Sequence, residues 1–228
     1  MHTKIIATIG PASLDYEVLK NMKKEGMNIC RINTKHGDEK QWTTIYRNAR
    51  KVGCEILFDI NNLEKIEWVK KCEFDYIAVS YAKDREHIRK IKKLFLPKKV
   101  KIIAKIETKN GLKKIDEIID ESFGVMVARG DLSKNISYEK VPIEQKLIIK
   151  KCNAKKKFVI TATEMLLSLM NSKSPERSEI SDIANAIFDG SDAIMLSEET
   201  AIGKYPSLSV KVMENTIKYT EKNLYRLK

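Results

Sequence analysis

Charged side chains stand at points along the sequence where short apolar runs end. Glu107 ends one run, and Asp131 follows the next run within three residues. Two carboxylates that leave neighbouring strands could hold Mg²⁺ or Mn²⁺ and leave open positions for water and substrate oxygens. Lys105 precedes Glu107 by two residues, so in a strand the two side chains share one face. Lys105 could neutralise an oxyanion beside the metal or form a buried ion pair with Glu107, and the spacing leaves both interpretations open.

Other residues that could bind ligands follow further apolar runs. Arg31 offers a planar fork of N–H donors for a phosphate or carboxylate, and His36 could bind an anion or simply form surface hydrogen bonds. Thr163 could hydrogen-bond to a substrate or relay a proton, or it could be structural. Asp59 and Ser80 each end a run as well, so polar residues recur at the same end of several predicted strands.

The elements that carry these residues alternate between strands and helices. Eight runs rich in Ile and Val, with no interior proline, predict strands over residues 4–10, 28–33, 55–60, 76–81, 100–107, 124–128, 158–163 and 192–197. Apolar residues at helical spacing lie between them. Trp42, Ile45 and Ala49, for example, follow a predicted cap at Asp38 and precede a terminating Gly53.

Eight strand–helix units predict an α/β fold with a parallel sheet, closed as a (β/α)₈ TIM barrel in a single domain over residues 1–228. A doubly wound open sheet is the alternative, but the glycine-rich G-x-G-x-x-G turn that such sheets often carry is missing from the sequence. In a barrel, catalytic residues lie where the strands end, at the carboxyl-terminal rim. The residues named above all follow strand ends, so we expect them at this rim.

Composition and charge exclude several classes of protein. No run of eighteen apolar residues is present and the chain starts in a strand-like run, so we expect no membrane partner and no signal peptide. Four scattered cysteines without C-x-x-C spacing argue against a disulfide framework or a zinc site and favour a cytoplasmic location. The net charge of +12 suits small anionic substrates. Because its lysines are dispersed in pairs without interleaved aromatic residues, we expect no nucleic-acid partner.

Seven segments from one end of the sequence to the other resemble the catalytic barrel of the pyruvate kinase family. They are residues 4–13 (KIIATIGPAS), 31–37, 101–107 (KIIAKIE), 124–132 (GVMVARGDL), 160–165 (ITATEM), 176–190 (ERSEISDIANAIFDG) and 191–206 (SDAIMLSEETAIGKYP). The resemblance implies a (β/α)₈ barrel and a pyruvate-kinase-like transferase. It also implies a small-molecule substrate, which is phosphoenolpyruvate, pyruvate or a related 2-oxo acid, and Mg²⁺ or Mn²⁺ as cofactor.

The resemblance also implies roles for the candidate residues. Glu107 and Asp131 correspond to the divalent-metal ligands. Lys105 resembles the catalytic lysine that neutralises the phosphoryl group in flight and the enolate oxygen. Thr163 resembles the residue near the face on which the enolate carbon is protonated.

Further positions resemble the substrate and nucleotide contacts of the family. Arg31 and Asn33 resemble contacts to phosphate and to a monovalent cation, and His36 resembles a residue on the nucleotide side. The implied substrate-binding residues start a short helix, whose backbone N–H groups could hold a carboxylate, and include a threonine after the next strand. They are Ala128, Arg129, Gly130, Asp131 and Thr163.

The sequence departs from the family pattern where pyruvate kinases insert a lid domain after the third strand. Here Asp59 is followed within a few residues by a predicted helix over residues 63–71. A lid would exclude water and close over the nucleotide during phosphoryl transfer, so the departure puts transfer to ADP in question. The retained pocket also suits a metal-dependent pyruvate-enolate lyase, either an aldolase or an oxaloacetate decarboxylase. A non-catalytic metabolite-binding module is the third hypothesis.

Two more features concern the monovalent cation and assembly. Lys35 stands where the family usually has a serine that helps to bind K⁺, and Ile60 replaces a threonine of the same site. We therefore expect the Lys35 ammonium to replace K⁺ and to pair with Asn33 and Asp59. Residues 174–188 resemble the barrel-to-barrel interface of the family, which implies a homodimer.

Overall fold

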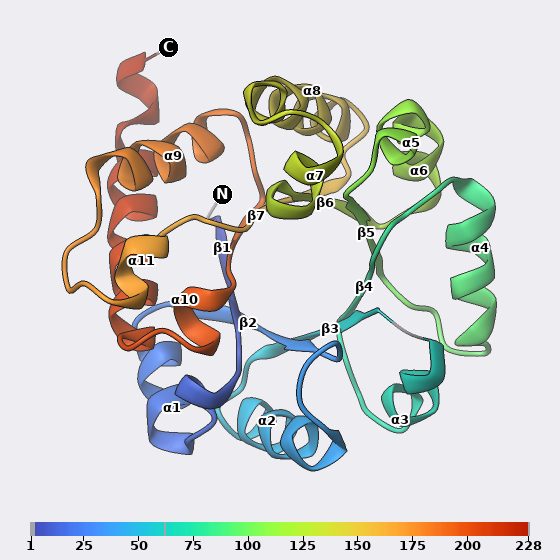
Figure 1. The fold of residues 1–228 in the computed structure, drawn as a ribbon, viewed down its shortest axis with the longest axis horizontal. Coiled ribbons are helices and arrows are strands. Elements are labelled where there is room, and N and C mark those ends of the chain that lie inside the picture. The colour runs from blue at the N-terminus through green and yellow to red at the C-terminus, as the bar shows by residue number, and fades with distance from the viewer. Residues whose placement is uncertain (1–2, 62, 228) are drawn as a thin grey trace.

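The computed structural model describes residues 3–61 and 63–227, and within these ranges eight parallel strands form a closed barrel (Figure 1). Each strand pairs with the next along the chain, and the last pairs with the first to close the ring. The strands are β1 (Lys4–Thr8), β2 (Met27–Asn33), β3 (Glu55–Ile60), β4 (Tyr76–Val79), β5 (Ile102–Ile106), β6 (Gly124–Ala128), β7 (Phe158–Ala162) and β8 (Ala193–Leu196). The predicted (β/α)₈ barrel is confirmed.

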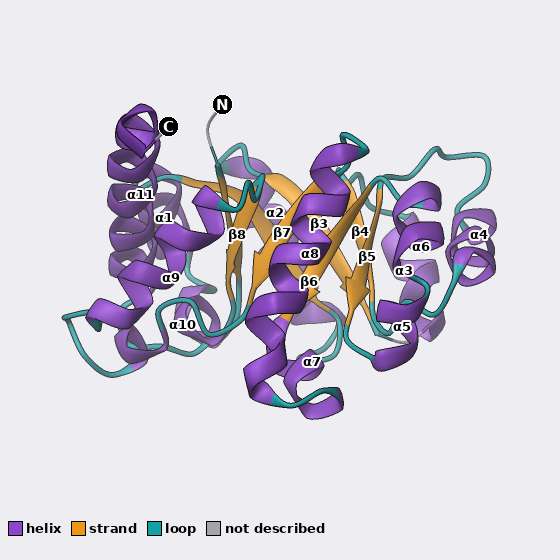
Figure 2. Ribbon diagram, turned by 90° about the horizontal axis from the view of Figure 1, so that it is seen from above, coloured by secondary structure: helices purple, strands orange, loops and turns teal. Residues whose placement is uncertain are grey.

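Helices surround the ring of strands, and α7 and α10 lie at the carboxyl ends of the strands (Figure 2). Capping side chains begin several of them: Asp15, Asp38 and Asp84 accept hydrogen bonds from backbone N–H groups in the first turns of α1, α2 and α4. The helices are α1 (Tyr16–Lys24), α2 (Glu39–Lys51), α3 (Ile66–Lys70), α4 (Arg85–Leu94), α5 (Lys109–Lys113), α6 (Ile115–Glu121), α7 (Arg129–Asn135), α8 (Val141–Ala154), α9 (Arg177–Phe188), α10 (Glu198–Ala201) and α11 (Pro206–Asn223).

Apolar side chains fill both sides of the strand ring. The barrel interior contains buried residues from successive strands, among them Ile6, Ile29, Leu57, Ile103 and Met126. The outer faces of the strands pack against the helices in a second, larger cluster. Because the interior is filled with side chains, a ligand can reach the barrel only at its ends.

Differences from the sequence-based elements have local causes. The predicted strands over residues 76–81 and 100–107 are shorter in the structure, where β4 ends at Val79 and β5 covers Ile102–Ile106. The residues beyond these bounds have no partner in the strand ladder. Helical periodicity does not reveal α8, because Ile143 and Leu147 put apolar side chains on its exposed face as well.

The four cysteines are all buried, and none forms a disulfide, as their spacing predicts. Of the helices in the described part of the chain, none combines the length and the apolar character that crossing a bilayer requires.

Candidate functional site

Four charged side chains meet at the carboxyl ends of β2, β3 and β5, where the sequence predicts the site. They are Arg31, Asp59, Lys105 and Glu107, which we call the rim cluster. Their exposed fractions are 7%, 0%, 6% and 1%, so all four are buried. The two positive and two negative formal charges balance, which allows the fold to hold them away from water.

Asp59 is the centre of the rim cluster. Its Oδ2 atom accepts hydrogen bonds from Nε of Arg31 at 3.0 Å and from Nη2 at 2.7 Å. The Lys105 ammonium lies 3.2 Å from the same oxygen. Burial alone would raise the pKa of Asp59, but the charges of Lys105 and Arg31 outweigh it and lower the pKa below its ordinary value. Asp59 is therefore held as a carboxylate.

Lys105 and Glu107 form the buried ion pair that was one of the two interpretations of their spacing. Nζ of Lys105 lies 3.1 Å from Oε1 of Glu107 and donates to Oγ of Ser80 at 2.9 Å. The other carboxylate oxygen of Glu107 accepts a hydrogen bond from the backbone N–H of Tyr81. Burial raises the pKa of Glu107, and these partners offset the effect only in part.

Asp131 lies in the first turn of α7, directly after β6. Because β5 pairs with β6 with Ile106 opposite Val127, Glu107 and the start of α7 leave the barrel side by side. Burial would raise the pKa of Asp131. An ion pair with Lys134 at 2.9 Å, together with the nearby charges of Lys105 and Lys35, lowers the pKa instead. Lys105 therefore acts electrostatically on both predicted metal ligands.

These two carboxylates leave neighbouring strands, which is one requirement of a divalent-cation site with two protein ligands. Within residues 3–61 and 63–227, no group of three or more His, Cys, Asp or Glu residues could hold a metal ion by itself. Mg²⁺ commonly binds through one or two carboxylates while substrate oxygens and water fill the other positions. Burial raises the pKa of Glu107 although Lys105 and the Tyr81 backbone N–H act against the rise. With two carboxylates and no third ligating residue among those described, any such cation would need further oxygen ligands from substrate or water.

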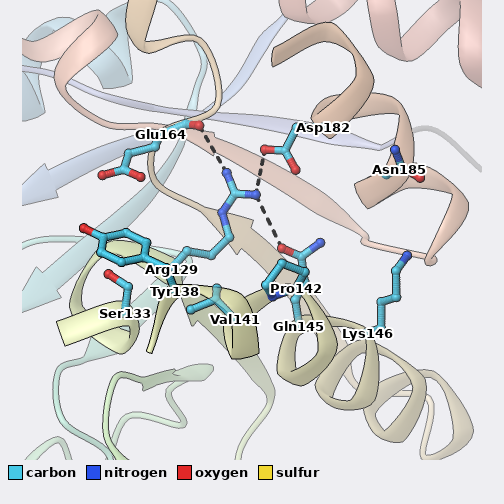
Figure 3. A pocket seen from close by; sticks show the side chains of 10 residues that line it. All are labelled: Arg129, Ser133, Tyr138, Val141, Pro142, Gln145, Lys146, Glu164, Asp182 and Asn185. Atoms are coloured by element: carbon cyan, nitrogen blue, oxygen red, sulfur yellow. Dashed lines mark hydrogen bonds and ion pairs between the residues drawn. The ribbon is translucent and has the colours of Figure 1, made fainter. Parts of the chain in front are cut away.

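Thr163 and Arg129 lie after β7 and β6, and their side chains face different ways. The Thr163 hydroxyl accepts a hydrogen bond from the Gly130 backbone N–H at 2.8 Å. The Arg129 guanidinium instead contacts Asp182 and lines a separate cavity of about 500 Å³ on the outer side of the barrel (Figure 3). The Arg129 side chain is therefore absent from the rim cluster, so a substrate role there is left to its backbone and to Ala128 and Gly130.

The expected pair between Lys35 and Asp59 is not found. Lys35 is exposed, and the ion pairs that Asp59 forms with other described residues are with Arg31 and Lys105. The expectation is wrong because Asp59 is fully buried and two closer cations already compensate its charge. Asn33 does meet Lys35, but through the Lys35 backbone N–H, which donates to Oδ1 of Asn33 at 3.1 Å.

A second cavity, of about 380 Å³, adjoins the rim cluster and joins residues from both ends of the chain. Arg31, Asn33 and His36 line it together with Trp42 and Ser197. Oγ of Ser197 is buried and, within the described residues, has no hydrogen-bond partner. The structure thus brings three of the predicted binding residues into one cavity.

Three further polar residues complete the rim: Thr8, Ser80 and Asn61. Oγ1 of Thr8 accepts a hydrogen bond from Nη1 of Arg31 at 2.7 Å. Ser80 donates to Oδ1 of Asn61 at 2.7 Å and accepts from Lys105. Each of the three residues stands at or just after the end of a strand, the position by which the sequence already singles out Ser80.

Comparison with known proteins supports the barrel assignment. The family model described as pyruvate kinase, barrel domain, matches residues 1–63 and 59–210. The two matched parts overlap at residues 59–63, where β3 ends. A pyruvate kinase of Methanocaldococcus jannaschii is 44% identical over 169 residues, which cover 73% of this chain and 38% of that protein.

Two further relatives show similar values. A pyruvate kinase of Geobacillus stearothermophilus is 49% identical over 153 residues, covering 66% of this chain and 26% of that protein. A pyruvate kinase of Thermococcus litoralis is 47% identical over 163 residues, covering 70% and 34%. The matched part of this chain thus spans between 26% and 38% of the length of these three relatives.

Proposed function

The chain belongs to the pyruvate kinase family, and we propose that its barrel rim binds phosphoenolpyruvate or the enolate of pyruvate together with Mg²⁺ or Mn²⁺. The observation that carries this proposal is the rim cluster, in which a buried lysine is shared between Asp59 and Glu107. Glu107 and Asp131 would hold the cation, which would supply Lewis-acid stabilisation of an enolate oxygen when bound.

The chain's own residues would divide the remaining work. Lys105 carries a buried positive charge beside Glu107, so it would neutralise the enolate or phosphoryl oxygen of a ligand bound at Glu107. Arg31 lines the adjoining cavity and would contact a phosphate with guanidinium N–H groups that Asp59 leaves unused. Thr163 would hydrogen-bond near the enolate carbon, and the backbone of Ala128, Arg129 and Gly130 would hold the substrate carboxylate.

The cavity of about 380 Å³ beside Arg31 is the place where a nucleotide would bind if the protein transfers a phosphoryl group to ADP. His36 and Asn33 line this cavity and would contact that ligand. However, β3 ends at Ile60 and a helical turn begins at Leu63, which leaves no lid domain between them. This observation favours a second candidate function, a metal-dependent lyase that forms or protonates a pyruvate enolate without nucleotide.

Calorimetry with oxalate, which resembles the pyruvate enolate, tests the proposal. We expect oxalate to bind in the presence of Mg²⁺ or Mn²⁺ and not in its absence. Glu107→Gln should remove this binding, whereas Glu67→Gln should keep it, because Glu67 forms an exposed pair with Lys70 on α3. Equal oxalate affinity with and without the cation would refute the metal site.

An activity panel then separates the candidate functions. Phosphoenolpyruvate with ADP tests phosphoryl transfer, and oxaloacetate or aldol substrates without nucleotide test the lyase. Oxalate binding without turnover in any of these assays would identify the metabolite-binding module instead.

We also propose a cytoplasmic homodimer. The four free cysteines support a reducing location. Phe188 at the end of α9 and Tyr219 on α11 are 46% and 71% exposed and line a shallow groove between these helices. Light scattering at micromolar concentration should give the mass of a dimer, and Phe188→Asp should reduce it to that of a monomer. A monomeric mass for the unaltered protein would refute the dimer.

A further inference from the structure

The turn after β7 contains two consecutive non-glycine residues in the left-handed region of backbone space. Thr163 has a φ of 74° and Glu164 a φ of 53°. A β-branched residue rarely adopts positive φ, because its side chain crowds the neighbouring carbonyl oxygen. Such a conformation persists only where the surrounding structure holds it. The contacts of the 163–164 turn therefore identify what fixes the position of Thr163.

Arg129 supplies most of these contacts. Nη2 of Arg129 donates to the carbonyl oxygen of Thr163 at 2.6 Å and to that of Glu164 at 3.2 Å. Nε donates to the same Thr163 oxygen at 3.2 Å and to the carbonyl oxygen of Ala162 at 3.3 Å. One guanidinium thus engages three successive carbonyl groups across the strained turn, and its planar geometry fixes their directions.

The guanidinium is itself held from the opposite side. Nη1 of Arg129 donates to Oδ2 of Asp182 on α9 at 2.6 Å and lies 3.4 Å from Oε1 of Gln145 on α8. Figure 3 shows the guanidinium between Asp182, Gln145 and the backbone at Glu164, at the wall of the outer cavity. The Arg129 side chain is only 12% exposed, so its ion pair with Asp182 is partly shielded from solvent. Asp182 therefore orients the donors that Arg129 presents to the turn.

The hydroxyl group of Thr163, at the carboxyl end of β7, is held by a second set of contacts. The Thr163 hydroxyl accepts from the Gly130 backbone N–H at 2.8 Å and donates to the Ala162 carbonyl at 2.6 Å. Gly130 directly follows Arg129 in the first turn of α7. The same short segment thus holds Thr163 twice, by its carbonyl through the Arg129 side chain and by its hydroxyl through the Gly130 backbone.

We infer that Arg129 is a positioning residue, which together with Asp182 holds the strained 163–164 turn and so sets the Thr163 hydroxyl at the rim. The inference rests on the proposed function, because the proposed function gives the Thr163 hydroxyl a place near the enolate carbon. Asp182 lies on α9, the helix proposed above to face a second copy.

Hydrogen–deuterium exchange tests the structural half of the inference. Arg129→Met should increase exchange at the amides of residues 163–166, whereas Lys146→Met should leave it unchanged. Lys146 lines the same cavity, but its ion pair is with Asp189 and does not touch the turn. Asp182→Asn, which keeps the Arg129 side chain, should produce a smaller increase and serves if Arg129→Met does not fold. Unchanged protection of residues 163–166 in both variants would overturn the inference.

Enolisation of pyruvate tests the functional half. With Mg²⁺ in D₂O, a C3–H bond of pyruvate breaks and a C–D bond to a solvent deuteron forms, with no net redox change, and NMR follows the loss of the methyl protons. Arg129→Met should lower kcat about 10- to 100-fold with little change in KM, since it displaces a group at the reacting carbon and not the metal ligands. Arg129→Lys should recover part of kcat.

The two measurements separate the possible failures. If the unaltered protein shows no exchange at C3, the proposed function fails and amide exchange alone decides the role of Arg129. If the unaltered protein enolises pyruvate and Arg129→Met does so equally fast, the positioning role is refuted while the proposed function stands.

Discussion

Replacing Asp59 by asparagine tests whether the rim cluster is held together by charge. The substitution keeps the shape of the side chain but removes a carboxylate that is 0% exposed and contacts Arg31 and Lys105. Lys105 would then keep Glu107 as its charged partner, whereas Arg31 would keep only the neutral hydroxyl of Thr8 among the contacts described. Removing one partner of a buried ion pair costs about 3–5 kcal/mol of unfolding free energy. For a chain of this length that corresponds to a decrease in Tm on the order of 10 °C.

Glu107→Gln in the same cluster should behave differently. The lowered pKa of Asp59 means that the folded protein favours the charged carboxylate. The stability that this charge contributes is present above the ordinary pKa of 3.8, and it is lost as the pH falls through the folded-state pKa. The raised pKa of Glu107 means the reverse. The stability that protonated Glu107 contributes to the folded protein is lost as the pH rises from the ordinary pKa of 4.5 through the raised pKa. At pH 7, Glu107→Gln should therefore destabilise the fold less than Asp59→Asn.

Urea unfolding at pH 5 and pH 7 measures both effects, with Glu67→Gln as the control for an exposed pair. The difference in stability between the unaltered protein and Glu107→Gln should shift in favour of the variant as the pH rises. The reasoning is refuted if Asp59→Asn unfolds at the same urea concentration as the exposed control, or if Glu107→Gln proves the more damaging change at pH 7.

Three further predictions follow from particular contacts. Gly124→Ala should destabilise the protein strongly in urea unfolding, because a Cβ there would lie 2.4 Å from the carbonyl oxygen of Phe158 on the neighbouring strand. Native protein at pH 8 should react slowly with a thiol reagent and unfolded protein quickly, since burial raises the pKa of Cys54 to about 11 and that of Cys152 to about 12. Lys134→Ala should tighten Mn²⁺ binding by at most about fivefold in calorimetry, because it frees Asp131 from an ion pair that is largely exposed.

Much of the fold could be predicted from the sequence, because each strand is a compact apolar run that enters a polar turn. The β3 run, for example, is correctly bounded at Glu55 and Ile60. The predicted strands extend beyond the ends of β4 and β5, since pairing with neighbouring strands decides those ends. The amphipathic pattern failed for α8, where an exposed Ile143 hides the helical period.

The site was predictable in its residue types and much less so in its contacts. Strand ends located Arg31, Asp59, Lys105 and Glu107, because the carboxyl ends of parallel strands converge in a barrel. Which charged side chains form ion pairs depends on how deeply each one is buried. The spacing of residues in the sequence does not show how deeply a side chain is buried. Lys35 follows β2 by two residues and its side chain is exposed, whereas Asp59 is buried. The buried Arg31 and Lys105 side chains pair with Asp59 instead.

The contacts of Lys105 limit how the proposed site can act. Its ammonium has three N–H donors, and Asp59, Glu107 and Ser80 already lie within reach of them. To face an enolate oxygen, Lys105 must therefore release one partner. Asp59 is also held by Arg31 and is fully buried, so it stays in place. Glu107 is the charged partner that can be released, because a cation bound to it would compensate its charge, and the availability of Lys105 would thus depend on metal binding.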